Sequence, residues 1–284
     1  MDFLLASLVD GLLIGSVYGL AAMGLTLIWG VMRVTNLAHG ALIALGMFGV
    51  YGLFSAGLNP YIGVLLVAGC GLLAGMGIYY IALHRVINAP QLSTLLATFA
   101  VNMIIIGIGT TLFSTSPRNV DFSLGSFSLG SVMVQNTRLI AALASVVITG
   151  TLYVFLYRTR PGKHIRAVSS NRAAAELMGI DSTRILALSF GLGALLATTA
   201  GGLIATFFPF TILSGETYQL KSFVIGVMGG LGNPLGALVG GLILGLLEGL
   251  IPIIMPTTWV PVLEFLLFVI ILLVRPSGIL GAKR

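Results

Sequence analysis

The chain has 284 residues, of which 57% are hydrophobic and only 8% charged, and its mean hydropathy is +1.10. A soluble domain needs about a quarter of its residues charged, so this composition excludes one and indicates a protein that crosses a membrane several times. The net charge of +6 then indicates which loops face the cytoplasm rather than nucleic-acid binding. The single cysteine, Cys70, excludes an intramolecular disulfide.

Nine apolar segments follow one another along the chain. They span about residues 4–31, 37–57, 60–82, 92–113, 139–157, 185–210, 219–230, 236–255 and 260–274. No basic residue precedes Arg33, so we expect the first segment to be a retained helix rather than a cleaved signal peptide. The seventh is shorter than the about 20 residues that a crossing needs, so it either extends back through residues 211–221 or is a broken helix. We therefore expect an all-α transmembrane bundle of eight to nine helices, preferably nine, forming one domain over residues 1–284.

Positive charge predicts the orientation of this bundle. Eight of the 22 Asp, Glu, Lys and Arg residues lie between Arg158 and Arg184, with a net charge of +4. If that loop is cytoplasmic, alternation places Arg33, Arg85 and the C-terminal tail on the same side, as the positive-inside rule expects. The N-terminus and the loop 114–138 are then predicted to be outside.

Glycine recurs at a spacing of four residues in three places. The ladders are Gly11, Gly15 and Gly19; Gly232, Gly236 and Gly240; and Gly241, Gly245 and Gly249. On a helix each ladder occupies one face, where small residues let neighbouring backbones approach closely. We expect these faces to be packing surfaces within the bundle.

Residues 161–181, PGKHIRAVSSNRAAAELMGID, form a polar island. Pro161-Gly162 is expected to interrupt the helix that ends near Tyr157. A short helix is predicted over 171–178, with Asn171 or Ser170 as its N-cap and Gly179 as its left-handed closing residue. Ile180 supplies the apolar contact of that ending, and Asp181 or Ser182 caps the next helix. From composition alone, the short helix could lie on lipid head groups or dock on a partner protein.

Several polar residues interrupt apolar segments and are candidates for a transport pathway. Asn36 and His39 could line such a pathway or stabilise a break between two helices. Thr94, Thr98 and Asn102 form one stripe at i, i+4 and i+8, although threonine often bonds the carbonyl groups of its own helix.

Glu248 lies near the middle of its segment, where a carboxylate must face protein or water. It could belong to the pathway or to an interface with a partner, or be a protonated or hydrogen-bonded structural acid. Asp10 and Glu264 lie nearer the ends of their segments, where we expect them to be interfacial anchors. The Gly232-Asn233-Pro234 sequence predicts a tight cytoplasmic turn.

The sequence lacks common motifs for nucleotide binding and for metal binding. There is no G-x-x-x-x-G-K-[ST], so the chain is not expected to bind ATP through a P-loop. There is no H-E-x-x-H and no Cys/His cluster, so we expect no metal site, no cofactor and no enzymatic activity.

Three stretches together resemble a known family. Residues 15–46 contain a GLTLI element followed by a turn with Arg33, Asn36, Ala38, His39 and Gly40; residues 164–181 and 229–248 supply the other two motifs. In this order they resemble the H-type permease of branched-chain amino acid ABC transporters, over nearly the whole chain. The Leu-Pro ending of the general importer loop is absent after Ile180.

This resemblance implies a permease in the bacterial cytoplasmic (inner) membrane that imports leucine, isoleucine, valine or related small amino acids and amides. The implied partners are an M-type or homologous second permease, two cytoplasmic ATPases and an extracytoplasmic substrate-binding protein. The loop 158–184 would couple to the ATPases. The implied coupling residues are Arg166, Asn171, Arg172, Ala174, Ala175, Glu176, Gly179 and Ile180. The alternative is a secondary transporter driven by protons or sodium ions, in which Glu248 would be central.

Overall fold

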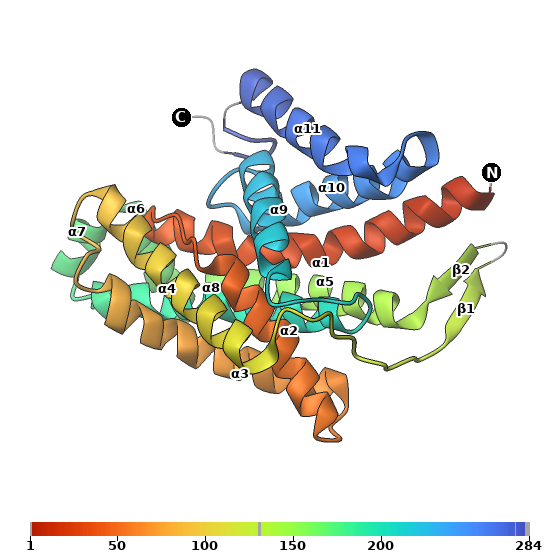
Figure 1. Ribbon diagram of the computed structural model, residues 1–284. Helices are drawn as coiled ribbons and strands as arrows, with labels where there is room; N and C mark the ends of the chain where they lie inside the picture. The colour runs from red at the N-terminus through yellow and green to blue at the C-terminus, as the bar shows by residue number, and fades with distance from the viewer. Residues whose placement is uncertain (1, 130–131, 276, 282–284) are drawn as a thin grey trace.

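The computed structural model describes residues 2–129, 132–275 and 277–281. The molecule is a bundle of helices with one small β-hairpin at its edge (Figure 1). The N-terminus and the hairpin lie at one end of the view, and the short helices α6 and α7 lie at the opposite end. The prediction of an all-α helix bundle is confirmed, with the hairpin as the element that it missed.

Within the described residues, seven helical segments are long and apolar enough to cross a membrane. They are α1 (Asp2–Met32), α3 (Pro60–Ile78) with its π-helical extension η1 (Tyr79–Leu83), α4 (Gln91–Phe113), α5 (Asn136–Arg158), α8 (Ser182–Ala205), α10 (Pro234–Ile254), and the 3-10 turn η2 (Thr257–Trp259) with α11 (Val260–Val274).

Two further helices are shorter: α2 (His39–Ser55) has 17 residues and α9 (Ser214–Gly229) has 16. Helix α9 is the seventh predicted segment, extended back as one of the two alternatives proposed. The lengths therefore do not confirm eight or nine crossings.

The polar island forms two helices, α6 (Arg160–Ser170) and α7 (Arg172–Leu177). The helix was expected to be interrupted at Pro161-Gly162, but the interruption lies at Thr159, two residues earlier. Pro161 instead lies in the first turn of α6. Proline lacks only an N–H that has no partner at that position, so it begins a helix without cost. The Thr159 hydroxyl accepts a hydrogen bond from the Gly162 amide at 3.2 Å and caps the new helix.

The loop between α4 and α5 contains two short antiparallel strands, β1 (Ser126–Leu129) and β2 (Val132–Gln135). Ser126 pairs with Gln135 at one end of the hairpin. The chain before β1 is anchored by paired backbone bonds between Arg118 and Phe210, at 2.8 and 2.9 Å.

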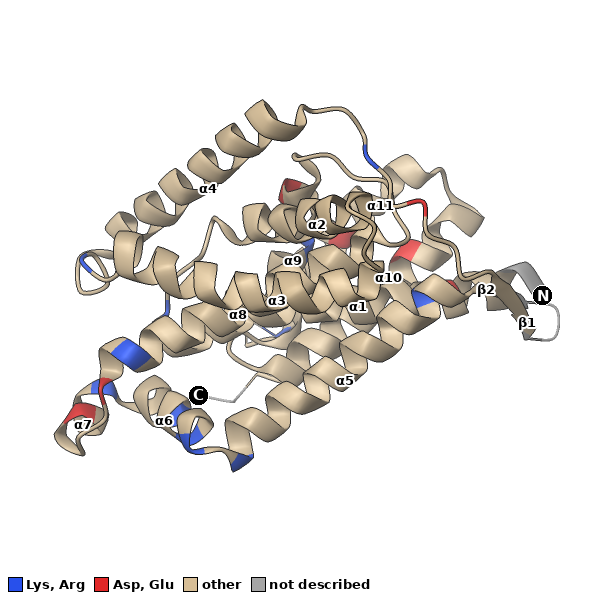
Figure 2. Ribbon diagram, turned by 90° about the horizontal axis from the view of Figure 1, so that it is seen from below, with Lys and Arg blue, Asp and Glu red and all other residues tan. Residues whose placement is uncertain are grey.

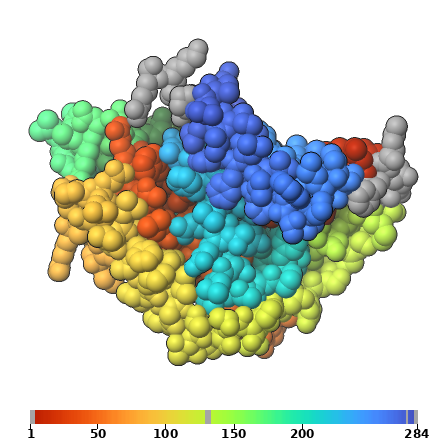
Figure 3. Space-filling model, turned by 45° about the horizontal axis from the view of Figure 1, so that its top comes forward, coloured from red at the N-terminus to blue at the C-terminus, as the bar shows by residue number. Residues whose placement is uncertain are grey.

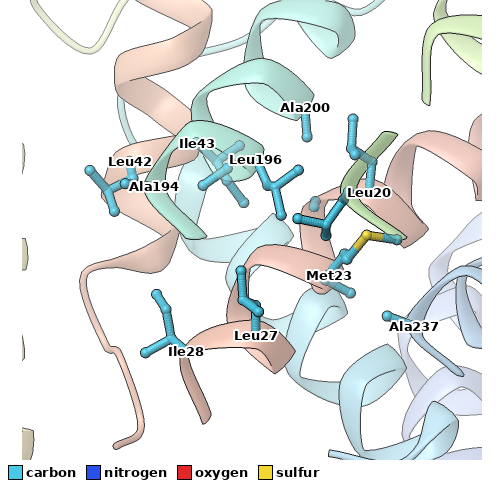
Figure 4. Packing of buried hydrophobic residues seen from close by; sticks show 14 of the residues in the cluster. Leu20, Met23, Leu27, Ile28, Leu42, Ile43, Ala194, Leu196, Ala200 and Ala237 are labelled. Carbon is cyan, nitrogen blue, oxygen red and sulfur yellow. The ribbon is translucent and has the colours of Figure 1, made fainter. Parts of the chain in front are cut away.

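Helices α1 and α8 form the centre of the bundle, and most of each is buried. Figure 4 shows Leu20, Met23 and Ile28 of α1 against Ala194 and Ala200 of α8. By contrast, α4 and α11 expose large apolar side chains such as Leu112 and Leu273, which are 70% and 80% exposed. Apolar side chains on such outer helices suit contact with lipid or with another membrane protein.

The glycine ladders lie where helix backbones meet. The first ladder on α1 faces the third ladder on α10, and a Cβ atom added at Gly15 would lie 2.6 Å from the Gly241 carbonyl oxygen. The second ladder packs partly on α9, where Gly236 faces Gly229. The expectation of close backbone packing is therefore confirmed at these helix pairs.

Candidate functional site

Charged residues of the bundle gather mainly in two places (Figure 2). One is the end that carries α6 and α7, where many of the Lys and Arg residues lie. The other lies among α9, α10 and α11, inside the otherwise uncharged part of the molecule. Helix α9 adjoins α11 on the face shown in Figure 3.

Helix α7 is a short helix closed at both ends. The Asn171 Oδ1 atom accepts a hydrogen bond from the Ala174 amide at 3.0 Å, which caps its start. Gly179 has φ +81°, and the Ile180 amide donates to the Ala175 carbonyl oxygen at 3.1 Å, which is a Schellman ending. Asp181 caps α8 by accepting from the Arg184 amide. The predicted boundaries and caps of this helix are confirmed.

The side chain of Glu176 is held within its own loop. Arg172 Nε lies 3.0 Å from Glu176 Oε1, and Arg172 Nη1 donates to Asn88 Oδ1 at 3.0 Å. The Ser182 hydroxyl also donates to Glu176, and these bonds from Ser182 and Arg172 lower the pKa of the Glu176 carboxyl. The network joins α7 to the start of α8 and to the turn after η1.

The tip of this loop is apolar. Leu177 and Met178 are 89% and 82% exposed, whereas Ala175 is buried beneath them. Ala174 is exposed on the same short helix. Large apolar side chains on the charged end of the molecule therefore offer a contact surface.

Arg166 joins α6 to α5. Its Nε atom donates to the Leu156 carbonyl oxygen at 3.1 Å, and its guanidinium group lies 4.5 Å from the centre of the Tyr157 ring. Helix α6 also buries Ile165 and Val168. Arg166 therefore has a position that fixes the angle between the two helices.

The break between α1 and α2 contains the predicted polar turn. The Asn36 Oδ1 atom accepts from the Ala38 amide at 3.0 Å, and His39 Nε2 donates to the Ala21 carbonyl oxygen at 2.9 Å. The Gly40 amide donates to Gln219 Oε1 at 3.0 Å. Asn36, His39 and Gly40 are all buried, and their bonds connect the start of α2 to α1 and α9.

The polar stripe of α4 is buried on the same side. Thr98 Oγ1 accepts from the Leu37 amide at 3.2 Å and lies 3.3 Å from the Thr35 carbonyl oxygen. Thr94 bonds the Gln91 carbonyl oxygen of its own helix and lines a cavity of about 600 Å³ with Arg33. Asn102 is 8% exposed. Thr98 thus holds the helix break directly.

Glu248 belongs to a second cluster, inside the bundle. Lys221 Nζ on α9 lies 2.6 Å from Glu248 Oε2 on α10 and 3.1 Å from Glu264 Oε1 on α11. The Tyr18 hydroxyl on α1 donates to Glu248 Oε1 at 3.3 Å, and Lys221 Nζ lies 4.8 Å from the centre of the Tyr18 ring. Four helices therefore contribute to one ionic cluster.

This cluster corrects one expectation. Glu264 is not an interfacial anchor, because its side chain is only 7% exposed and paired with Lys221. Asp10, whose side chain is 42% exposed, pairs with Arg138 of α5, and its expected role as an interfacial anchor stays a prediction. The sequence analysis missed Lys221 and Tyr18 as site residues. A lone lysine within an apolar segment was the available signal, because such a charge needs a partner of opposite sign.

A cavity of about 780 Å³ opens onto the cluster. Charged side chains and apolar walls both line it. Its lining includes Asp10, Ile14, Tyr18, Arg138, Thr217, Tyr218, Lys221, Val224, Glu248, Val260, Glu264 and Phe265. The predicted site residues thus fall into three groups: the α6–α7 loop, the helix break with α4, and Glu248 in this cavity.

Helix α9 connects the last two groups. Gln219 bonds the Gly40 amide at the start of α2, and Lys221, two residues later, bonds Glu248 and Glu264. The backbones of Gly40 and Gly215 also come into close approach. One short helix therefore connects the start of α2 to the ionic cluster.

Comparison with known proteins gives a consistent result over most of the chain. The family model described as branched-chain amino acid transport system / permease component matches residues 7–272. The permease protein LivH of a high-affinity branched-chain amino acid transport system is 30% identical in Escherichia coli K12 and 29% in Salmonella typhimurium, each covering 98% of this chain and 96% of the relative. The corresponding protein BraD of Pseudomonas aeruginosa is 28% identical over 98% of this chain and 95% of its own length.

Proposed function

The chain belongs to the branched-chain amino acid permease family, and from this premise we propose that it is the membrane-spanning permease subunit of an ATP-driven ABC importer. The observation that carries the proposal is the family match over residues 7–272, which includes the α6–α7 loop. The chain conducts the substrate and is not itself an enzyme. Partner subunits hydrolyse the ATP.

The partners follow from this role. A second permease of the M type or a homologue pairs with this chain, two ATPases bind on the cytoplasmic side, and a binding protein delivers substrate from outside. The capped helix α7 supports the ATPase contact, because it presents Leu177 and Met178 to solvent at the charged end of the molecule. Exposed apolar side chains surrounded by polar ones are typical of protein interfaces.

In the proposed mechanism, movement of the ATPases is transferred to the permease and switches it between two states. Closure of the ATPases displaces α7, and the bonds of Arg172 to Asn88 and Ser182 pass the displacement to η1 and α8. Asn171, Gly179 and Ile180 keep α7 rigid, and Arg166 holds α6 on α5. ATP binding supplies the difference in free energy between the states, so this chain needs no cofactor of its own.

The chain acts as one domain in the bacterial cytoplasmic (inner) membrane, with its N-terminus outside and its C-terminus in the cytoplasm. The basic α6–α7 end supports this orientation. The substrates are leucine, isoleucine and valine, as the names of the relatives suggest. The binding protein is expected to set much of the selectivity.

Four residues hold the hinge between α1 and α2 rather than contacting substrate: Asn36, His39, Gly40 and Thr98. Asn36 Oδ1, His39 Nε2 and Thr98 Oγ1 bond backbone groups, and the Gly40 amide bonds Gln219. Thr94 and Asn102 lie on the same face of α4, one turn before and one turn after Thr98. Such a hinge gives α2 a defined pivot during the change of access.

The coupling role is tested with Glu176→Lys, which replaces the carboxylate that Arg172 and Ser182 hold. The variant is expected to be produced normally and to bind the ATPases, but to lose most ATP-driven leucine uptake in proteoliposomes. The matched control is Lys163→Glu, a charge reversal on the exposed face of α6, which is expected to transport normally. Normal uptake by Glu176→Lys, with ATPases bound, contradicts the proposed coupling.

A further inference from the structure

We propose that the cavity between α1, α9, α10 and α11 is a transit site for aliphatic α-amino acids, in which Glu248 receives the ammonium group of the substrate. This inference rests on the proposed transport function and adds a location and a recognition chemistry to it. It assigns Lys221, Tyr18 and Glu264 as residues that position Glu248.

The charges of the cavity favour a ligand that brings a positive group. Three carboxylates line it, from Asp10, Glu248 and Glu264, but only two cations, from Arg138 and Lys221. Asp10 and Arg138 pair with each other, so Lys221 alone serves two carboxylates. An excess negative charge within a membrane protein is costly, and the ammonium group of a zwitterionic amino acid gives one of these carboxylates a local partner of opposite charge.

Of the two carboxylates that Lys221 bonds, Glu248 is the one that a ligand can reach. Its side chain is 31% exposed, compared with 7% for Glu264, whose Oε1 atom is bonded to Lys221. Lys221 takes the Oε2 atom of Glu248 at 2.6 Å, whereas Oε1 receives only the long bond of 3.3 Å from the Tyr18 hydroxyl. The Oε1 atom therefore has the capacity to accept a strong charge-assisted bond from an ammonium group.

The rest of the cavity suits the remainder of such a ligand. Ile14, Val224, Val260 and Phe265 provide apolar walls for an aliphatic side chain, and the hydroxyl groups of Thr217 and Tyr218 line the same space. A volume of about 780 Å³ lies within the range of small-molecule sites, which is about 300–1,000 Å³. Apolar walls with a few polar groups at one place are typical of such sites.

The depth of the cluster also suits transit. Glu248 lies 14 residues beyond Pro234 in α10, or about 21 Å along the helix axis at 1.5 Å per residue. That distance is most of the way across a hydrocarbon core of about 30 Å. With the proposed orientation, the cavity lies in the outer half of the membrane, on the side where a binding protein delivers the substrate.

The test measures how far a bound ligand protects a cysteine in the cavity from chemical labelling. Thr217→Cys is introduced with Cys70→Ser into the complete permease–ATPase complex in membranes, without the binding protein, and a water-soluble methanethiosulfonate is the probe. L-leucine is expected to slow labelling roughly tenfold at about ten times its Kd, because only the empty fraction of sites reacts. The analogue 4-methylvalerate, which has the carbon skeleton without the ammonium group, is expected to give no protection.

Two variants connect the protection to Glu248. Glu248→Gln should abolish protection by leucine, and Glu248→Asp should restore part of it. Glu216→Gln, which makes the same change of charge on an exposed residue of α9, should leave protection unchanged. Equal protection by leucine and 4-methylvalerate, or protection that survives Glu248→Gln, overturns the transit site. ATP-driven leucine uptake by the unlabelled wild-type importer is measured in parallel, and its absence refutes the proposed function instead.

Discussion

Gly15 lies where the backbones of α1 and α10 come closest. A Cβ atom at this position would lie 2.6 Å from the Gly241 carbonyl oxygen and 3.1 Å from the Gly245 Cα atom. Neither neighbour is a flexible side chain, so the two helices must separate to admit a methyl group. Association of membrane helices depends on such close packing, since no hydrophobic driving force acts between them.

Gly15→Ala is therefore expected to destabilise the protein by about 1–3 kcal/mol, the usual cost of overpacking. The control is Gly77→Ala in α3, where a Cβ atom meets nothing within 4 Å. That change should be neutral or stabilising by up to about 1 kcal/mol, because alanine favours the helix over glycine. Thermal melting in detergent compares the two variants, and equal midpoints would show that the α1–α10 contact is not tight.

The sequence predicts that a charged residue in a membrane segment needs a partner of opposite charge, but it does not show which residue is that partner. The rule that an intramembrane charge needs a partner applied to Glu248 and would have applied to Lys221. The partners are separated by 27 and 43 residues, and only the packing of α9 between α10 and α11 brings them together. Glu264 was misplaced for the same reason, because its distance from the segment end did not reveal its contact with Lys221.

Helix α7 is an element whose two ends could be predicted from the local sequence. Its caps, Asn171 and Gly179, are short-range features of the backbone, so the helix was predictable from its sequence. The preceding α6 was missed because Pro161 was interpreted as a helix breaker rather than a first-turn residue. The hairpin was missed because its strands have four residues each, too few to show a clear alternation.

The left-handed conformation of Gly179 gives a prediction at this scale. Gly179→Val is expected to lose most ATP-driven uptake, because a β-branched residue at φ +81° distorts the end of α7. Gly179→Asn should retain much of it, since asparagine tolerates that conformation. Uptake and ATPase co-purification are measured for both variants. Similar uptake by the two would show that the closing turn does not matter for coupling.

On the scale of the whole molecule, the bundle has a buried centre of α1 and α8 and a polarised distribution of charge. The basic end predicts a cytoplasmic α6–α7 loop and an external hairpin. Ser170 and Ser123 are exposed in these two regions.

In a Cys70→Ser background, Ser170→Cys should react with an impermeant thiol reagent only in inverted vesicles. Ser123→Cys should react only in intact cells. The opposite pattern would reverse the orientation and move the α6–α7 loop away from the ATPases.

In the proposed function, partner ATPases drive transport through this chain. The most direct measurement is leucine uptake by proteoliposomes that contain the chain, its second permease and the ATPases, with the binding protein added on the outer side. The account predicts uptake that requires ATP and all partners, with none from this chain alone under a proton or sodium gradient. Gradient-driven uptake by the chain alone, independent of ATP, would contradict it and identify a secondary transporter.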